Sequence, residues 1–295
     1  MKNTATVSRR SFLTGAGALA GLAAVSMAGC APQAAAPAAT ETASEGSELA
    51  ATGSDWLGAA PEIAEGDIVE TRDTELLIIG AGNGGMAAAA TAADLGLDFT
   101  LCEKTESIQK TRHWFGAINT KYTKAAGAEV DTAKLLNEFT RYASGQADQR
   151  VVRVWIDESA EVTDWLDPIL TAAGMTCAFD NDIDHETGGT DFYLAPMEHY
   201  YSGKDEAGEA LERNKVLLAY INERGYDVTY SHSLARLVQD ESGRVTGAIF
   251  ETPEGYVQIN SEKGVLLTTG GYTSNADMLR GCNPMVDRCV TLQYG

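Results

Sequence analysis

The stretch "LLIIGAGNGGMAAAA", Leu76 to Ala90, places a glycine-rich turn between an apolar run and a run of alanines. The continuous apolar run within residues 75–79 predicts a strand over these residues that is buried on both faces, as in a parallel sheet. Residues 82–95 predict a helix that follows the turn, and "LDFTLCE" predicts a second strand. Together these elements predict one βαβ unit of about 30 residues.

The glycines of the turn fit the pattern G-x-G-x-x-G, with a strand before it and a helix after it. In such a unit Gly80 permits the tight turn and Gly82 lets the backbone approach a pyrophosphate. Gly85 lets the helix lie close to the sheet, while the helix N-terminus supplies N–H groups and a positive dipole. The pattern therefore predicts a site for the pyrophosphate of a dinucleotide cofactor.

Glu103 ends the second strand, 23 residues after Gly80. An acidic residue in this place accepts hydrogen bonds from a ribose 2′-hydroxyl, which favours an unphosphorylated adenosine ribose. NAD and FAD share this ADP half, so the turn alone leaves both open. The residues predicted to contact the cofactor here are Gly80, Ala81, Gly82, Asn83, Gly84, Gly85, Glu103 and Lys104.

The rest of the chain predicts helices and a late group of strands. Apolar residues at helical spacing predict helices over residues 131–143, 150–174 and 205–225, with a loop-rich segment before the last. From Tyr226 short alternating runs with "DESG" and "PEG" turns predict a strand meander that ends in another buried strand, Val265 to Thr268. The fold class is α/β: a Rossmann-like domain with a central parallel sheet, a β-meander and inserted helices.

A second pattern lies near the end of the chain. The stretch "GRVTGAIFETPEGYVQINSEKGVLLTTGGY", Gly243 to Tyr272, resembles the second signature of FAD-dependent flavoproteins of the fumarate reductase and succinate dehydrogenase superfamily. There a strand ends in Ala-Thr-Gly-Gly-aromatic near the cofactor, and Thr268 replaces the alanine here. The resemblance runs from about Asp55 to Gly295 and implies that the cofactor is FAD.

One segment departs from this family. In "SIQKTRHWFGAIN", Gln109 and Lys110 stand where relatives have a Gly-Gly pair. At the position of the family's later Gly-Gly pair, this chain has Gly116 and Ala117. His113 lies three residues before Gly116, whereas the histidine that binds FAD covalently in relatives lies six before its glycine. We therefore expect non-covalent FAD. The further contacts that the resemblance implies are Arg112, Gly116, Ala117, Leu234, Thr269, Gly270 and Gly271.

Arginine and histidine in the middle of the chain give weaker signals. For Arg112, neutralisation of a pyrophosphate or of a reduced flavin and simple solvation both stay open. His185, His199 and His232 have no partner pattern, so we expect surface or core roles for them. No catalytic residue is assigned.

The resemblance implies an FAD-dependent oxidoreductase that passes a hydride to an activated C=C bond of a small, fumarate-like organic acid. The electrons would come from an external cytochrome or quinol-linked donor. Two alternatives stay open: a dehydrogenase of the ketosteroid type, and a flavin-binding or electron-transfer module without its own substrate site. The family also has a capping domain with the proton donor, and the chain stops at "CVTLQYG", before such a domain. We therefore expect the 295 residues alone to be inactive.

The first 54 residues predict export rather than a folded domain. "SRRSFLTG", with Arg9 and Arg10 before a weakly apolar run, resembles a twin-arginine signal. Export by this route would bring the protein to the periplasm or to the outer face of the cytoplasmic membrane. "SMAGC" resembles a lipoprotein cleavage box and favours a lipid anchor at Cys30. Residues 31–54 lack an apolar period and predict a disordered tether. The domains are thus 1–30 (signal), 31–54 (tether) and 55–295 (incomplete FAD-binding domain).

Composition excludes other classes. The net charge of −20 repels phosphate backbones, so nucleic acid is not an expected partner. Cys30 aside, the chain has four cysteines and no C-x-x-C pattern, so no zinc, iron-sulfur or c-type haem site is expected. The cysteines Cys102, Cys177, Cys282 and Cys289 are expected to be packing residues.

Overall fold

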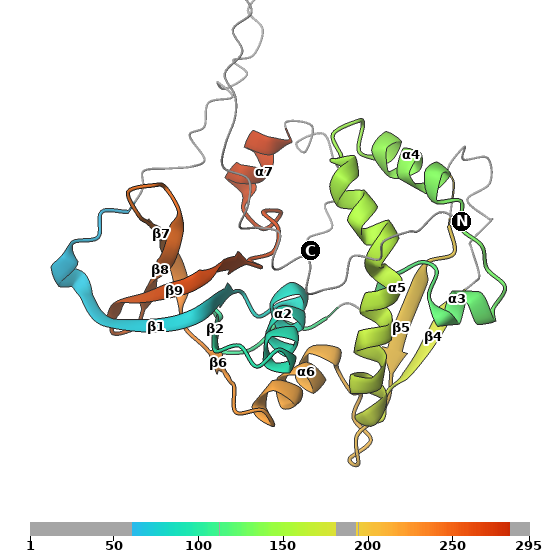
Figure 1. Cartoon of the computed structure of the whole chain (residues 1–295), viewed down its shortest axis with the longest axis horizontal. Helices are drawn as coiled ribbons and strands as arrows, with labels where there is room; N and C mark the ends of the chain where they lie inside the picture. The colour runs from blue at the N-terminus through green and yellow to red at the C-terminus, as the bar shows by residue number, and fades with distance from the viewer. Residues whose placement is uncertain (1–60, 112, 181–192, 194, 284–295) are drawn as a thin grey trace, which may run out of the picture. The chain divides into compact units, whose positions relative to one another are not determined.

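The computed structural model describes residues 61–111, 113–180, 193 and 195–283, all within one compact unit, Thr52–Gly295. Its main sheet has six strands in the order β6-β2-β1-β9-β8-β7 (Figure 1). The strands β6 (Val228–Thr229), β2 (Phe99–Cys102), β1 (Ile68–Ile79) and β9 (Gly255–Leu267) pair in parallel. The predicted α/β fold with a mostly parallel central sheet is confirmed.

Strand β1 is the central strand and is longer than the sequence predicts. The sequence predicts a strand only over residues 75–79, but residues 68–74 also belong to β1, which follows the 3-10 turn η2 (Glu65–Asp67). These residues pair with the first half of β9, and this long-range partner has no local signal in the sequence. At the far end of β1, Leu77 and Ile78 are both fully buried, as expected of a strand covered on both faces.

One face of the sheet is covered by α2 (Asn83–Asp94) and α6 (Arg213–Asn222). Ile78 of β1 packs there in one core with Met86 of α2 and Ile221 of α6. The alanines of α2 have small side chains, which lets this helix lie close to the strands. The predicted βαβ unit is confirmed, with Gly82 and Leu95 capping α2.

The antiparallel strands β7 (Ser233–Gln239) and β8 (Val245–Thr252) extend the same sheet beyond β9, and their side chains contribute to a second core on the other face of β1. Leu77 and Ile79 pack there against Phe250 and Ile259. The meander is confirmed, but the separate strand expected at Val265–Thr268 is wrong, because β9 runs without a break from Gly255 to Leu267. That strand end is also not fully buried, since Leu266 is 41% and Leu267 50% exposed.

A second sheet was not predicted. It has three antiparallel strands in the order β3-β5-β4: β3 (Trp114–Gly116), β5 (Glu198–Ser202) and β4 (Thr176–Asp180). The helices α3 (Lys121–Ala125), α4 (Thr132–Tyr142) and α5 (Gln149–Ala172) accompany it. Figure 1 shows α5 between the two sheets, and its side chains contribute to cores on both sides.

The helices predicted over 131–143 and 150–174 are confirmed as α4 and α5. The helix predicted from Asp205 is wrong in its first half, because α6 begins only at Arg213 with Glu212 as its N-cap. Residues 204–210 instead form a turn closed by a bridge between Lys204 and Ala210, with Gly208 at a positive φ of 86°. The last helix, α7 (Ala276–Cys282), follows the end of β9.

Candidate FAD site

The glycine turn joins β1 to α2 and requires glycine at two positions. Gly80 has a φ of 104°, and a Cβ there would lie 2.5 Å from the backbone oxygen of Thr268. A Cβ on Gly85 would lie 1.7 Å from the carbonyl oxygen of Gly80. The tight turn predicted at Gly80 and the close helix packing predicted at Gly85 are therefore both present.

The N-terminus of α2 is open. Its N-cap is Gly82, which provides no side-chain hydrogen bond to the first turn. A Cβ built on Gly82 would have no atom within 4 Å, and one on Gly84 would meet only the Thr268 side chain, at 3.4 Å. The first turn of this 12-residue helix thus has no side-chain cap, and the positive end of the helix dipole lies at the same place. This geometry fits a pyrophosphate; the contacts predicted for Gly82, Asn83 and Gly84 stay predictions.

Glu103 lies against the turn itself. Its side chain is buried, and Oε2 accepts a hydrogen bond from the N–H of Ala81 at 2.8 Å. Oε1 accepts from the N–H of Thr105 at 3.1 Å and from its hydroxyl at 2.9 Å. Two carboxylate oxygens offer about four acceptor positions, so a ribose hydroxyl could still be bound. Glu103 therefore stabilises the turn, while its predicted contact with a ribose stays a prediction; its neighbour Lys104 is exposed.

A buried asparagine ties a third segment to the turn. Asn214, at the start of α6, donates from Nδ2 to the carbonyl of Gln109 at 2.8 Å and to Oδ1 of Asn83 at 3.3 Å. The N–H of Gln109 donates in turn to the carbonyl of Ala81 at 3.4 Å. The sequence reasoning missed Asn214 because 131 residues separate it from Asn83. Its only signal is an amide in the first turn of α6.

The segment that begins at Thr268 and contains Gly270 and Gly271 lies beside the glycine turn at the end of β1. The N–H of Thr268 donates to the carbonyl of Ile79 at 2.9 Å, and its hydroxyl lies 2.8 Å from the carbonyl oxygens of both Ile79 and Gly80. The threonine that replaces the family's alanine thus joins the two glycine motifs. The predicted contacts that follow it, Thr269, Gly270 and Gly271, are exposed, and Gly270 has a positive φ of 78°.

The other predicted contacts lie apart from the turn. Gly116 belongs to β3, and its carbonyl accepts from the indole N–H of Trp155 at 3.0 Å; Ala117 is buried, with its N–H on the carbonyl of Met197. Leu234 packs on the meander core. None of the described contacts brings these three to the glycine turn, and Arg112 lies outside the described residues.

His113 is exposed and stacks on Tyr200, with ring centroids 4.6 Å apart. His199 is fully buried, and its ring nitrogens contact the Thr120 hydroxyl and the Met197 carbonyl, each at 2.9 Å. Burial lowers the pKa of His199, so this ring is neutral at pH 7. The core role expected for His199 is confirmed.

Two of the described cysteines are buried thiols. Burial raises the pKa of the Cys102 thiol to about 12 and that of Cys177 to about 11. Cys282 is exposed, so the expected packing role is wrong for this residue, and Cys289 lies outside the described residues. The described part of the chain contains no group of three or more side chains suited to a metal ion. Nor does any helix in that part have the length and apolar character to cross a membrane.

A strand, a glycine turn, an uncapped helix N-terminus and a carboxylate at the end of the next strand define the class of proteins that bind the ADP half of a dinucleotide. Within this class, the chain belongs to the FAD binding domain family, which matches residues 75–292. FAD is thus the cofactor that the family assignment supports.

Relatives of the chain are longer flavoproteins. The vinyl phenol reductase of Lactiplantibacillus plantarum is 25% identical over 210 residues, 70% of this chain and 39% of the relative. The urocanate reductase of Eggerthella lenta is 26% identical over 243 residues, 79% of this chain and 37% of the relative. A flavocytochrome c3 fumarate reductase in an open conformation has a similar fold, with a TM-score of 0.58 at 24% identity, covering 74% of this chain and 37% of that structure. The chain therefore spans less than two-fifths of the length of these proteins.

Proposed function

We propose that this chain forms the FAD-binding part of an oxidoreductase that reduces an activated C=C bond in a small, fumarate-like organic acid. FAD binding is supported by one observation: the N-terminus of α2 has no side-chain cap and lies beside Glu103. The names of the relatives support the substrate half, because vinyl phenol, urocanate and fumarate all contain a C=C bond conjugated to a ring or a carboxyl group.

The roles of the residues follow from their positions. The N–H groups at the start of α2 would bind the pyrophosphate, and the helix dipole would stabilise its charge. Glu103 and Asn214 would hold the turn and the Gln109 segment in place before the cofactor binds. Bound FAD would supply the hydride. The chain would contribute orientation, and no described residue is assigned as the proton donor.

The setting of the reaction is also a proposal. We infer that the protein is exported by the twin-arginine route, with Arg9 and Arg10 read by the export receptor, and anchored by a lipid at Cys30. Its electrons would come from a cytochrome or a quinol-linked donor outside the cytoplasm. The support is the pattern "SRRSFLTG" together with "SMAGC". Export that survives replacement of both arginines by lysine would contradict the route, and Cys30→Ala tests the anchor.

Replacing Gly82 by alanine tests the cofactor site directly. A Cβ at Gly82 meets no protein atom within 4 Å, so this variant should fold like the wild type. The methyl group would instead occupy the space proposed for the pyrophosphate, and we expect at least a tenfold rise in the Kd for FAD, measured by flavin fluorescence. Gly66→Ala is the matched control, because Gly66 also has no neighbour within 4 Å and lies before β1. Equal FAD affinity of the two variants would contradict the site.

The reaction itself is tested anaerobically on the longest form of the protein that its gene encodes. Reduced viologen should reduce the bound flavin, and fumarate, urocanate or a vinyl phenol should reoxidise it. Oxidation of a 3-ketosteroid with no reoxidation by any of these compounds would favour the dehydrogenase. Flavin that cycles only with artificial electron carriers would favour the electron-transfer module.

A further inference from the structure

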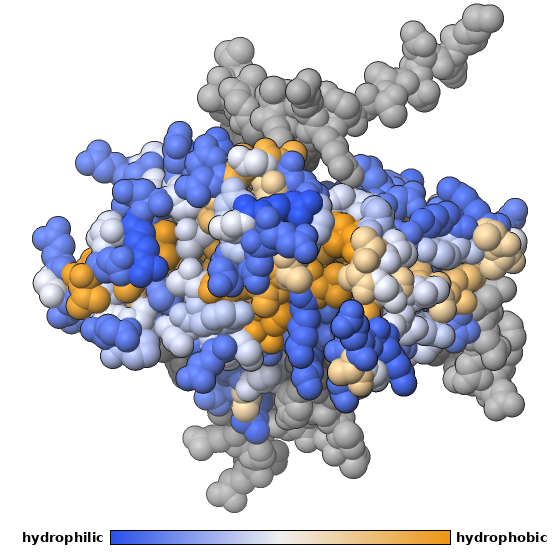
Figure 2. All heavy atoms as spheres, turned by 90° about the horizontal axis from the view of Figure 1, so that it is seen from below, coloured by the Kyte–Doolittle hydropathy of each residue, from blue (hydrophilic) through white to orange (hydrophobic). Residues whose placement is uncertain are grey.

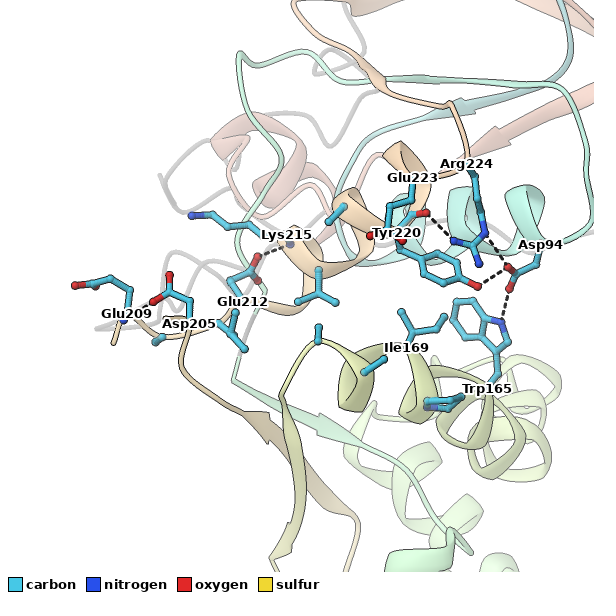
Figure 3. Close-up of a pocket in the computed structure, with 17 residues that line it drawn as sticks. Asp94, Trp165, Ile169, Asp205, Glu209, Glu212, Lys215, Tyr220, Glu223 and Arg224 are labelled. Atoms are coloured by element: carbon cyan, nitrogen blue, oxygen red, sulfur yellow. Dashed lines mark hydrogen bonds and ion pairs between the residues drawn. The ribbon is translucent and has the colours of Figure 1, made fainter. Parts of the chain in front are cut away.

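A groove lies between α5 and α6, on the far side of α6 from the residues that bind the glycine turn. Its volume is about 1040 Å³, which is at the upper end of the range for small-molecule sites. Figure 3 shows the two helices as its walls, with the turn of residues 205–212 at one end and Asp94 of α2 at the other. None of the predicted FAD contacts lines it.

The middle of the groove is apolar. Small and aliphatic side chains from both helices form its walls, with Leu211 from the turn. Several of these side chains are only half-buried, and Figure 2 likewise shows apolar surface between hydrophilic side chains on the lower face of the molecule. An apolar ligand body would therefore displace water from these walls at a favourable free energy. The apolar lining residues are Pro168, Ile169, Ala172, Ala173, Leu211, Val216 and Ala219.

At one end, the polar groups already have partners. The Asp94 carboxylate accepts from the Trp165 indole at 3.1 Å and from the Tyr220 hydroxyl at 2.5 Å, and lies 3.5 Å from Nε of Arg224. The Arg224 guanidinium also stacks on the Tyr220 ring, 3.4 Å from its centroid. Glu223 also lies at this end, whose one basic group, Arg224, is already paired with Asp94, beside the aromatic rings of Trp165 and Tyr220.

At the other end, carboxylates exceed basic groups. Asp205 accepts from backbone N–H groups of its own turn, and Glu212 accepts from Thr111 and from the N–H of Lys215. Burial raises the pKa of Glu212, but the hydrogen bonds from Thr111 lower it below its ordinary value, so this group is ionised at pH 7. All these donors are neutral. Glu209 is the third carboxylate at this end, and Lys215 is the basic side chain here.

We propose that this groove binds an amphipathic amine: a molecule with an aliphatic or aromatic body and one cationic head. The body would lie along the apolar walls between α5 and α6, and the head would lie among Asp205, Glu209 and Glu212. The lining has five carboxylates and two basic side chains, one of which is already paired with Asp94, so it opposes an anion of the same shape. The groove is therefore distinct in chemistry from any site for an organic-acid substrate.

The test compares hexylamine with hexanoate, which have the same number of carbon atoms and opposite charge at pH 7. The FAD-loaded full chain is titrated with each probe by calorimetry, with Trp165 fluorescence as a second readout because its indole lines the groove. We expect hexylamine to bind at least tenfold more tightly than hexanoate. Similar affinities, or no binding of hexylamine at millimolar concentration, would overturn the proposal.

Variants locate the binding. Ala219→Trp fills the groove from an exposed position of α6 and should abolish hexylamine binding, while FAD content and the melting temperature stay unchanged. Glu209→Gln removes one exposed carboxylate and should weaken binding about threefold to tenfold. Glu158→Gln is the matched control, because Glu158 is exposed on α5 and does not line the groove. Binding that is insensitive to Ala219→Trp, or equally sensitive to Glu158→Gln, would place the amine elsewhere.

Discussion

The two sheets of this protein are specified in different ways. The six-stranded sheet is organised around a contiguous strand, turn and helix, and its special features are glycines whose Cβ would meet backbone atoms. The three-stranded sheet is held by buried polar side chains that come from separate parts of the chain. A local pattern can therefore be read from the sequence, whereas partners that meet only in the folded chain cannot.

The polar cluster of the second sheet is centred on Asp167 of α5. Its carboxylate is buried and accepts from Lys121 Nζ at 2.5 Å, from the Tyr201 hydroxyl at 2.8 Å and from the Tyr122 hydroxyl. Burial alone would raise the pKa of Asp167, but these hydrogen bonds lower it below its ordinary value. His199 of β5, with its two satisfied ring nitrogens, is the second buried polar group of this sheet.

The largest expected effect is that of Gly85→Ala. The added Cβ would lie 1.7 Å from the Gly80 carbonyl oxygen, so either the turn or the first turn of α2 must move. We expect a loss of at least about 3 kcal/mol in the free energy of unfolding, or no folded protein. Gly84→Ala is the control, because its Cβ would meet only the Thr268 side chain, at 3.4 Å, which is an ordinary van der Waals distance. Equal denaturation midpoints for the two variants would show that the turn tolerates displacement.

The next largest effect is expected for Asp167→Asn, which tests the polar cluster of the three-stranded sheet. The amide cannot match the charge of Lys121 and turns one acceptor into a donor that faces the cluster. We expect a loss of about 2–3 kcal/mol in urea unfolding. Asp157→Asn, which breaks the exposed ion pair with Arg153 on the same helix, should cost about 0.5 kcal/mol or less. If the two substitutions cost the same, the cluster does not hold the second sheet.

The sequence predicts the βαβ part of the first sheet because the signals of this part are local, whereas the first half of β1, which pairs with β9, has no local signal. The βαβ unit, the strain at Gly80 and the packing at Gly85 all lie within one stretch of about 30 residues. The second sheet is not predicted, because β3 and β5 are short and pair across a long separation. In the site, Asn214 was missed for the same reason, and Gly116 was read from family spacing alone.

A smaller effect concerns pH and His199. Burial lowers the pKa of this ring below the value near 6.5 of the unfolded chain, so the folded state binds fewer protons. Its contribution to stability is complete above about pH 6.5 and is lost as the pH falls toward the folded pKa, by at most about 1.4 kcal/mol per pH unit. His199→Gln should flatten the dependence of the melting temperature between pH 7 and 5. His113→Gln, at an exposed position, should leave it unchanged; flattening by both variants would refute the assignment.

The smallest effect is that of Thr268→Ala, which restores the residue that the family pattern has at this place. The hydroxyl lies 2.8 Å from two carbonyl oxygens, but it has one proton to donate, and both carbonyls also belong to the turn at the end of β1. Its backbone N–H keeps the bond to Ile79 in the variant, so the two motifs stay joined. We expect a loss of about 1 kcal/mol or less in the free energy of unfolding.

Because the side chain packs near Gly84, its shortening also opens space beside the start of α2. FAD affinity should therefore stay within about threefold of the wild type, measured by flavin fluorescence. A larger loss of affinity without a loss of stability would mean that the Thr268 hydroxyl serves the cofactor rather than the junction of the two glycine motifs.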